Sequence, residues 1–228
     1  MITRVNKLFY YFSDIHLEKN YKRIFRINKN FRERPYLILL GDIGYVHENS
    51  YREFLYGMSE RFDKIFLIAG NHEYDGKKNV KEVNLEIENI CQVKNNLIFL
   101  QQKTFKVCDK NNIILAGCTL WSKLPKSKYE YHLEDKKWLY NTIKNNSKNN
   151  YIVATHHCPL FECLNTKDYL TANYFASDQS KIIKENNLLM WIHGHSHLNK
   201  DMNIYNKWIL SNQYGSYNKP LWNFNENK

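Results

Sequence analysis

Five short apolar runs, each ending abruptly at a polar cluster, are the feature of this sequence that most constrains its fold. The runs lie at 8–12, 36–40, 64–69, 151–154 and 188–192. They are rich in Ile, Leu and aromatic residues and do not alternate with polar residues, which is typical of strands buried on both faces. This pattern predicts a layered protein in which the strands are covered on both sides.

Segments with helical periodicity lie between several of these runs. At 48–62 the apolar Phe54, Leu55 and Met58 fall on one face of a helix. Strands that alternate with helices predict an α/β fold, and 228 residues without an internal repeat or linker are treated as a single domain, 1–228. Further helices are expected at 79–93, 133–143 and 178–185, further strands at 97–101, 113–121 and 207–212, and loops at 144–150 and 199–206.

The chain has a formal net charge of +10. A positive field attracts anionic partners, with nucleotides and nucleic acid among the candidates. Most lysines are spread along the chain, as solubilising surface charge would be, and we prefer that interpretation. The densest basic cluster, at 19–34, could instead border the mouth of a site and contact a polyanionic substrate.

Cysteine usage and the N-terminal run favour a cytoplasmic protein with no membrane partner. The five cysteines are an odd number without a CxxC pair, which argues for a reducing compartment. The run at 8–12 is followed at once by Asp14 and His16, with no small-residue cleavage site, and reads as a strand rather than a signal peptide. No apolar run is long enough to cross a bilayer. The oligomeric state is left open.

The polar clusters that end the strands carry side chains able to bind metals. In α/β sheets, ligands bind at the carboxyl ends of the strands. Carboxylates, imidazoles and an amide, without cysteine among the candidate ligands, favour Mn, Fe, Zn or Ni over a thiolate zinc site. The side chains delivered there are Asp14, His16, Asp42, Asn71, His72, His156, His157, His195 and His197.

The order of these clusters resembles the signature of the calcineurin-like metallophosphoesterases, which is DxH, GD, GNH[DE], a His after a strand, and GHxH. Here the motifs read Asp14-Ile15-His16, Gly41-Asp42, Gly70-Asn71-His72-Glu73, His156 and Gly194-His195-Ser196-His197. The resemblance spans 8 to about 215 and is closest to the small stand-alone bacterial and viral members. It implies an α/β fold of four layers, with two mixed β-sheets flanked by helices, known as the metallo-dependent phosphatase fold.

The resemblance also implies two metal sites that share one carboxylate. Two divalent transition metal ions are expected, manganese first, with iron, zinc or nickel as alternatives. Such a pair can clamp the attacking and leaving oxygens of an in-line displacement, with a metal-bridging hydroxide as the nucleophile. The implied ligands are Asp14, His16, Asp42 and His197 for the first metal, and Asp42, Asn71, His156 and His195 for the second.

His72 is implied to be a catalytic residue rather than a ligand. In the family it lies near the leaving group, where it protonates the departing oxygen or stabilises its charge. Family members often carry GDxxD, whose second Asp orients this His. Position 45 is a tyrosine here, so Asp75 or a backbone carbonyl is expected to orient His72 instead.

The remaining candidates near the motifs have simpler interpretations. His157 is the alternative to His156 as a ligand and is otherwise expected to make supporting hydrogen bonds. His193 is expected to be a satisfied core residue, and His47 and His132 are expected on the surface. Glu73 either lines the pocket or serves as a helix-start carboxylate.

These residues lead to two hypotheses about function. The first is a phosphoester hydrolase, either a phosphodiesterase or a phosphomonoesterase, with a protein Ser/Thr phosphatase included. The second is a non-catalytic metal-binding scaffold, as in the retromer subunit that keeps this fold and loses a key His. The complete ligand set, together with His72, favours the enzyme. Small phosphodiesters are expected over duplex DNA, and substrate-binding residues cannot be assigned.

Overall fold

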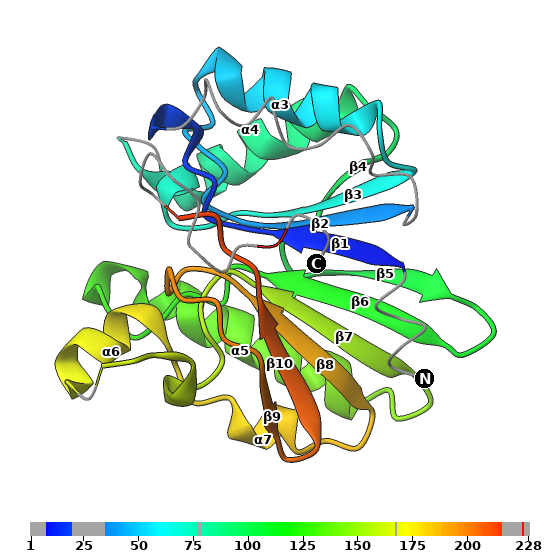
Figure 1. Cartoon of the computed structure of the whole chain (residues 1–228), viewed down its shortest axis with the longest axis vertical. Coiled ribbons are helices and arrows are strands. Elements are labelled where there is room, and N and C mark those ends of the chain that lie inside the picture. Colours follow the sequence, from blue (N-terminus) through cyan, green and yellow to red (C-terminus); the bar gives the residue numbers. More distant parts are fainter. Residues whose placement is uncertain (1–7, 20–34, 77–78, 167, 216–224, 226–228) are drawn as a thin grey trace.

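The chain forms two β-sheets that pack face to face, with helices on both outer sides (Figure 1). The computed structural model describes residues 8–19, 35–76, 79–166, 168–215 and 225. The predicted four-layer α/β sandwich is confirmed. Among the described helices, none is long and apolar enough to cross a bilayer.

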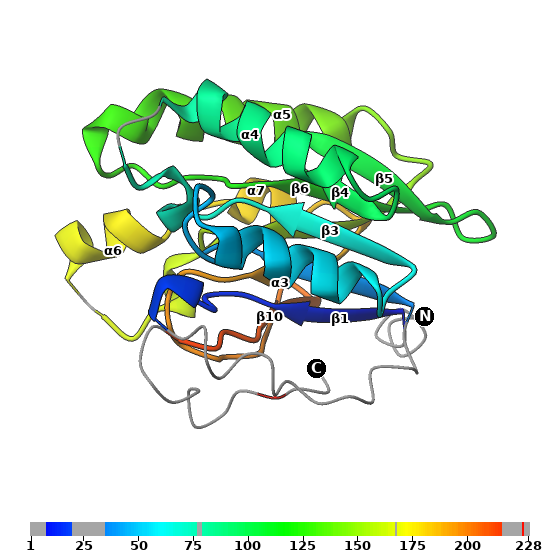
Figure 2. The same cartoon turned by 90° about the horizontal axis from the view of Figure 1, so that it is seen from above.

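The first sheet has the strand order β1-β2-β3-β4, and each of its neighbouring pairs is parallel, so among the described residues it is not the mixed sheet that was expected. Helices α3 and α4 lie side by side over its outer face (Figures 1 and 2). The bounds are β1 Phe9–Phe12, β2 Tyr36–Leu40, α3 Asn49–Ser59, β3 Lys64–Ile68, α4 Val80–Gln92 and β4 Leu97–Phe99.

The second sheet is mixed and has the order β5-β6-β7-β8-β10-β9, with β5 and β9 antiparallel to their neighbours. Helices α5 and α7 cover its outer face, and α6 projects beyond one end of the sandwich (Figure 1). The bounds are β5 Lys103–Cys108, β6 Ile113–Cys118, α5 Tyr129–Lys144, β7 Asn150–Thr155, α6 Tyr169–Phe175, α7 Ser180–Ile183, β8 Leu188–His193, β9 Met202–Ile204 and β10 Lys207–Ser211. Short 3-10 helices lie at His72–Tyr74, Lys126–Lys128 and Phe161–Cys163.

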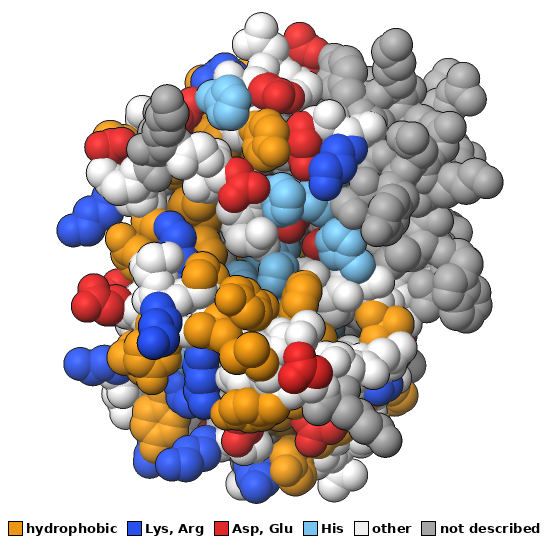
Figure 3. All heavy atoms as spheres, turned by 90° about the vertical axis from the view of Figure 1, so that its left-hand side faces the viewer, with side chains coloured by type: hydrophobic (Ala, Val, Ile, Leu, Met, Phe, Trp, Pro, Cys, Tyr) orange, Lys and Arg blue, Asp and Glu red, His pale blue; other side chains and the backbone are white. Residues whose placement is uncertain are grey.

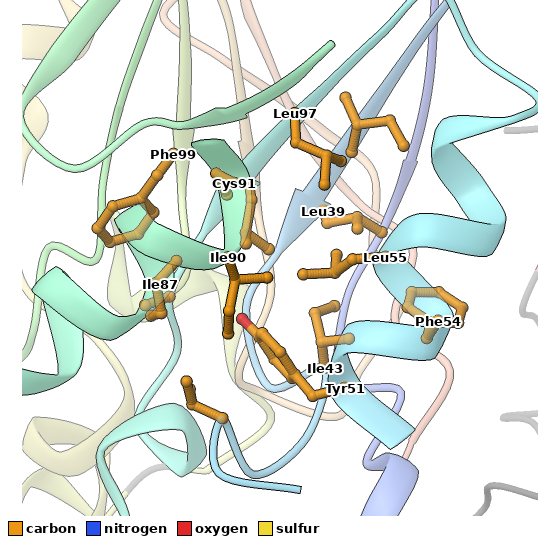
Figure 4. Close-up of a cluster of buried hydrophobic side chains, with 14 of the residues drawn as sticks. Leu39, Ile43, Tyr51, Phe54, Leu55, Ile87, Ile90, Cys91, Leu97 and Phe99 are labelled. Carbon is orange, nitrogen blue, oxygen red and sulfur yellow. The ribbon is translucent and has the colours of Figure 1, made fainter. Parts of the chain in front are cut away.

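Alternation along the buried strands sorts the core into three apolar layers. In β2, Leu37 and Leu39 belong to the cluster under α3 and α4, whereas Ile38 and Leu40 belong to the cluster between the sheets. Figure 4 shows the first of these layers, where α3 contributes Tyr51 and Leu55 beside Leu39. The third layer packs the far face of the second sheet against α5 and α7. Because both faces of each central strand are buried, polar side chains appear only where the strands end.

Several element boundaries differ from the sequence expectations. The strand expected at 113–121 ends at Cys118, because Leu120 and Trp121 adopt positive φ angles of 66° and 27° that a strand cannot continue through. The helix expected at 178–185 is confined to Ser180–Ile183, and β9 lies inside the expected loop at 199–206.

The expectation that His132 lies on the surface was wrong. It lies on α5 but is only 2% exposed. Its Nδ1 is 3.0 Å from the carbonyl oxygen of Leu120 and 2.9 Å from that of Trp121. Burial lowers the pKa of His132, so a neutral ring donates to this loop and supports its unusual backbone. His47 is exposed, as expected.

Candidate metal centre

The polar clusters from both sheets meet at one end of the sandwich. The first sheet supplies the segments after β1, β2 and β3, and the second sheet supplies those after β7 and β8. Viewed from that end, histidine side chains gather at the centre of the face (Figure 3). All seven predicted ligands, Asp14, His16, Asp42, Asn71, His156, His195 and His197, lie in this region.

Glycines allow the segments to approach this closely. A Cβ on Gly70 would overlap Asp42 Oδ1 and stand 2.6 Å from His156 Cε1. A Cβ on Gly194 would stand 2.7 Å from Ser13 Oγ and 2.9 Å from Asp14 Oδ2. The glycines of the GN and GH motifs are therefore required by steric contact with the candidate ligands.

Five of the seven candidate ligands have left-handed backbone conformations. Their φ angles run from 49° to 71°, in a region that residues other than glycine occupy only rarely and at a cost. Hydrogen bonds hold two of these residues in place, because Asp14 N donates to Gly41 O and His16 N donates to Asp42 O, each at 3.0 Å. The five residues are Asp14, His16, Asp42, His195 and His197.

The first ligand cluster combines two carboxylates with two imidazoles. One ligand atom from each of its members lies within 4.8 Å of the others. His16 Nε2 is 3.3 Å from His197 Nε2 and 3.8 Å from Asp42 Oδ2, and His197 Nε2 is 3.2 Å from Asp14 Oδ1. Asp14 Oδ1 is buried and accepts no hydrogen bond in the part of the chain that the structure describes.

The second cluster shares Asp42 with the first. Asp42, His156 and His195 offer ligand atoms within 4.8 Å of one another. His156 Nε2 lies 3.4 Å from Asp42 Oδ1, 3.1 Å from His195 Nδ1 and 3.1 Å from Asn71 Oδ1. The amide of Asn71 is therefore an oxygen donor beside this cluster.

Three of the imidazoles are held in the orientation that a metal ligand needs. In each ring the outer nitrogen faces a carboxylate or carbonyl oxygen, so it must carry the proton, and the inner nitrogen of the neutral ring presents a lone pair. The pairs are His16 Nδ1 with Glu18 Oε1 (2.9 Å), His156 Nδ1 with Leu40 O (2.7 Å), and His195 Nε2 with Tyr174 O (3.2 Å).

Converging lone pairs, a buried carboxylate oxygen without a donor and a shared Asp fit a pair of divalent cations. His156 Nε2 and His195 Nδ1 are 3.1 Å apart. If both rings are neutral, their lone pairs repel each other unless a proton or a cation lies between them. The donor set, of imidazole nitrogens with carboxylate and amide oxygens, suits borderline transition metals.

The pKa shifts within the cluster also favour bound cations. Burial alone would raise the pKa of Asp42, but the neighbouring imidazoles, His156 first and then His72 and His16, together hold that pKa well below its usual value. Burial opposes protonation of His156, yet Asp42 raises its pKa to about 9, while burial and the charge of His156 lower the pKa of His195 to about 4. The carboxylates thus attract positive charge into the cluster, which a proton on His156 supplies when no metal does.

His72 lies beside the first cluster, with its ring perpendicular to that of His16 at a centroid distance of 4.5 Å. Its backbone N–H donates to Asp42 Oδ1 at 2.8 Å. The ring of Tyr45 stacks at 6.4 Å and supplies no carboxylate. Asp75 Oδ2 lies 3.3 Å from His72 Nδ1, and Glu18 Oε1 lies 3.6 Å from the same atom. This nitrogen makes no hydrogen bond among the described residues, so orientation of His72 by Asp75 or a backbone carbonyl stays a prediction.

Two glutamates near the motifs, Glu73 and Glu18, make contacts that the sequence did not predict. Glu73 does not line the pocket but, as the other expectation had it, lies in the first turn of a helix, the 3-10 helix His72–Tyr74. It is 2% exposed, and its carboxylate accepts hydrogen bonds from the backbone N–H groups of Asp42, Ile43 and Gly70 at 2.8–2.9 Å. Glu18 joins His16 and His72 in a third group of potential ligand atoms.

The other two histidines near the motifs lie outside the potential ligand clusters of the described residues. His157 is buried, its ring centroid is 4.1 Å from that of His195, and burial lowers its pKa well below the usual value. His193 is also buried, as expected, with Nδ1 3.1 Å from Gly194 O, but its Nε2 has no hydrogen-bond partner among the described residues, so it is not the fully satisfied core residue that was expected. Of this adjacent pair, then, His156 and not His157 faces the carboxylates.

A pocket of about 550 Å³ opens over the cluster. Its lining includes candidate ligands and His72, together with the apolar and aromatic residues Trp121, Leu124, Pro125, Tyr174 and Phe175. A smaller pocket of about 310 Å³ adjoins it and shares Phe175, Ser196 and His197. In Figure 3, hydrophobic side chains border the histidines on one side.

Comparison with known proteins bears on this centre. The family model of calcineurin-like phosphoesterases matches residues 8–199. The chain belongs to this family. Over an alignment of 271 residues it is 30% identical to an uncharacterized protein of Acanthamoeba polyphaga mimivirus, covering 94% of this chain and 93% of that protein.

Two solved structures show how closely the fold of this family is followed. A phosphopantetheinyl hydrolase from Mycobacterium tuberculosis superposes with a TM-score of 0.71 at 14% identity, covering 91% of this chain and 89% of the other. A dimetal phosphatase from Danio rerio gives a TM-score of 0.64 at 12% identity, covering 93% and 88%. Both support the two-sheet fold.

Proposed function

We propose that this chain is a dinuclear-metal-dependent hydrolase of phosphoesters. The observation that carries the proposal is the pair of ligand clusters sharing Asp42, in a pocket that also contains His72. Asp14, His16, Asp42 and His197 would hold one ion, and Asp42, Asn71, His156 and His195 the other. When bound, two divalent ions polarise the phosphoester and acidify a water for in-line attack.

The residues of the chain have separate tasks in this reaction. Asp42 supplies the shared carboxylate, which offsets the mutual repulsion of two cations. Neutral imidazoles and the Asn71 amide add no negative charge, so the loaded site stays positive and attracts an anionic ester. His72 holds a proton beside the departing oxygen. The nitrogen and oxygen donors favour manganese, with iron, zinc or nickel as alternatives.

The shape of the pocket favours an ester with an organic alcohol group. Its volume of about 550 Å³ falls in the range of small-molecule sites, and apolar side chains line it together with the candidate ligands. Phe175 and the exposed Tyr174 offer aromatic surface to a planar group such as a nucleobase. A nucleotide ester, with a small phosphodiester preferred over a long nucleic acid, is therefore the proposed substrate class. The basic segment 19–34 considered for this role lies outside the described residues, apart from Lys19.

Elemental analysis and a substrate panel test the proposal together. The purified protein, reconstituted with manganese, should bind two ions per chain, and Asp42→Asn should reduce that number. The manganese-loaded protein should then hydrolyse mono-, di- or cyclic-nucleotide esters, and the metal-free protein should not. At most one ion per chain, with Asp42→Asn leaving the metal content unchanged, would defeat the two-metal assignment.

The second candidate function is a metal-binding scaffold that does not turn over substrate. It predicts two bound ions without hydrolysis of any ester in the panel. The proximity of His72 to the ligand cluster favours the enzyme, because a scaffold has no need of a proton donor there.

A further inference from the structure

Glu18 lies between two imidazoles that have different tasks in the proposed reaction. Its Oε1 is 2.9 Å from His16 Nδ1, on the ring nitrogen that faces away from the candidate metal ligands, and 3.6 Å from His72 Nδ1. The carboxylate is well buried, with 6% of the side chain exposed. One carboxylate thus faces a ligand ring and the ring of the proposed proton donor.

The packing around Glu18 leaves this carboxylate little freedom. Gly44, two residues after Asp42, lies directly against this region, because a Cβ there would be 3.0 Å from Leu17 Cβ and 3.6 Å from Glu18 Oε2. Within the described part of the chain, Glu18 Oε2 is buried and accepts no hydrogen bond. Among the described residues the side-chain hydrogen bonding of this carboxylate is therefore directed through Oε1 to His16, while His72 Nδ1, at 3.6 Å, is within ion-pair distance and makes no hydrogen bond of its own.

Position 45 explains why a carboxylate is needed from elsewhere. Family members often place an aspartate there to orient the His of GNH, whereas this chain has Tyr45, which stacks on His72 and offers no carboxylate. Asp75 also lies near His72 Nδ1, at 3.3 Å, but 53% of its side chain is exposed. Solvent screens an exposed carboxylate more strongly than a buried one, so Glu18 is the firmer anchor.

We propose that Glu18 is a positioning residue for both His16 and His72, so that a carboxylate from the segment after β1 replaces the one missing from the segment after β2. It fixes the proton of His16 on Nδ1 and leaves Nε2 for the metal. It also restrains the ring of His72 so that its Nε2 faces the departing oxygen. The second part rests on the proposed function, whereas the first concerns metal binding alone.

The first test is metal binding by Glu18→Gln, with Glu18→Asp as a second variant if Glu18→Gln fails to fold. Carboxylates that orient a ligating histidine typically contribute 10–100-fold to metal affinity or activity. Glu18→Gln should therefore still bind two manganese ions per chain, with affinity weakened by roughly that factor in a chelator competition. Unchanged affinity would overturn the role toward His16. Three ions in the native protein and two in the variant would also overturn it, since Glu18 would then be a ligand.

The second test asks whether Glu18 acts through His72, with saturating manganese and two substrates. Loss of a proton donor matters most for an alkoxide leaving group, such as the sugar oxygen of a nucleotide ester, and least for 4-nitrophenolate. In kcat, Glu18→Gln should lose roughly 10–100-fold on the nucleotide ester and several-fold less on the nitrophenyl ester. Asp75→Asn, which removes the exposed carboxylate, should lose less than Glu18→Gln on the same ester.

A double-mutant cycle completes the test. If Glu18 acts by orienting His72, then Glu18→Gln should cost little further kcat in a His72→Ala background, because coupled residues are not additive. Full additivity, or equal losses on both substrates, would overturn this role. If the native, metal-loaded protein hydrolyses neither ester, the proposed function fails instead, while the manganese affinities still decide the role toward His16.

Discussion

Glu73 is the residue whose substitution gives the sharpest test of how the centre is held together. Its carboxylate accepts three backbone N–H groups, from Asp42, Ile43 and Gly70, and so joins the segment after β2 to the segment after β3. Burial, followed by the charge of Asp42, raises the pKa of Glu73 to about 7. A carboxyl group kept in so unfavourable a place indicates that its acceptor oxygens are needed there.

Glu73→Ala leaves three buried donors without acceptors. Each unsatisfied buried donor costs about 1–3 kcal/mol, so the loss should be roughly 3–9 kcal/mol. That range is comparable with the whole stability of an ordinary domain, about 5–15 kcal/mol. In Glu73→Gln one oxygen can still accept from two of the donors, so the loss should be about 1–3 kcal/mol.

Urea denaturation of the metal-free proteins, followed by circular dichroism, measures these differences. Glu60→Ala is the control, because Glu60 is an exposed surface glutamate paired with Lys94, and it should cost no more than about 1 kcal/mol. If Glu73→Ala cost no more than this control, or less than Glu73→Gln, the three hydrogen bonds could not be what holds the two segments together.

Three further predictions concern other parts of the molecule. Gly70→Ala should lose metal, because its Cβ would overlap Asp42 Oδ1 and stand 2.5 Å from the backbone N of Asp42, so that the segment after β2 must shift; retention of two ions in elemental analysis would contradict the steric reasoning. Because the pKa of His156 is about 9 without metal, binding of manganese at pH 7.5 should release a proton. The measured heat of binding should therefore differ between two buffers of different ionisation enthalpy. An equal heat in both buffers would refute this prediction. Burial raises the pKa of Asp135 from 3.8 to about 7, so its contribution to stability is present below pH 3.8 and is lost as pH rises through about 7. Asp135→Asn should remove this dependence of stability on pH, which is worth at most about 4 kcal/mol. The urea midpoint of the native protein should fall more between pH 5 and 7 than that of Asp135→Asn, and equal shifts would contradict the prediction.

The sequence was most informative where burial is extreme. In β1, β2, β3, β7 and β8 both faces are covered, so the apolar runs were unbroken and their ends were sharp. By contrast, β5 is an edge strand with half-exposed and exposed residues, and β9 has three residues. Helix α6 has seven residues and exposes Tyr169 and Leu170, so it has little of the periodicity that marks a buried helix face.

The residues of the candidate site also differ in whether the sequence alone identifies them. Residue type and position after a strand selected nine candidates, and the resemblance to the family reduced these to the seven proposed ligands. Glu18 and Glu73 could not be selected in this way, because a carboxylate beside a motif looks alike whether it faces solvent or three backbone donors. Their contacts depend on which strand ends are neighbours in the folded sheet, and that adjacency is not written in the local sequence.

The two ligand clusters draw their members from both halves of the sandwich. Asp14, His16 and Asp42 follow strands of the first sheet, whereas His156, His195 and His197 follow strands of the second. Each bound ion would therefore link one sheet to the other at the end where the pocket opens, in addition to the apolar layer between the sheets. Loading with metal should raise the unfolding free energy by RT ln(1 + [M]/Kd), where [M] is the free metal concentration, and this is about 2.7 kcal/mol at a hundredfold excess over Kd. Removing the metal should loosen this end first, so amide hydrogens in the segments after β2 and β7 should gain exchange before those in the strands between the sheets.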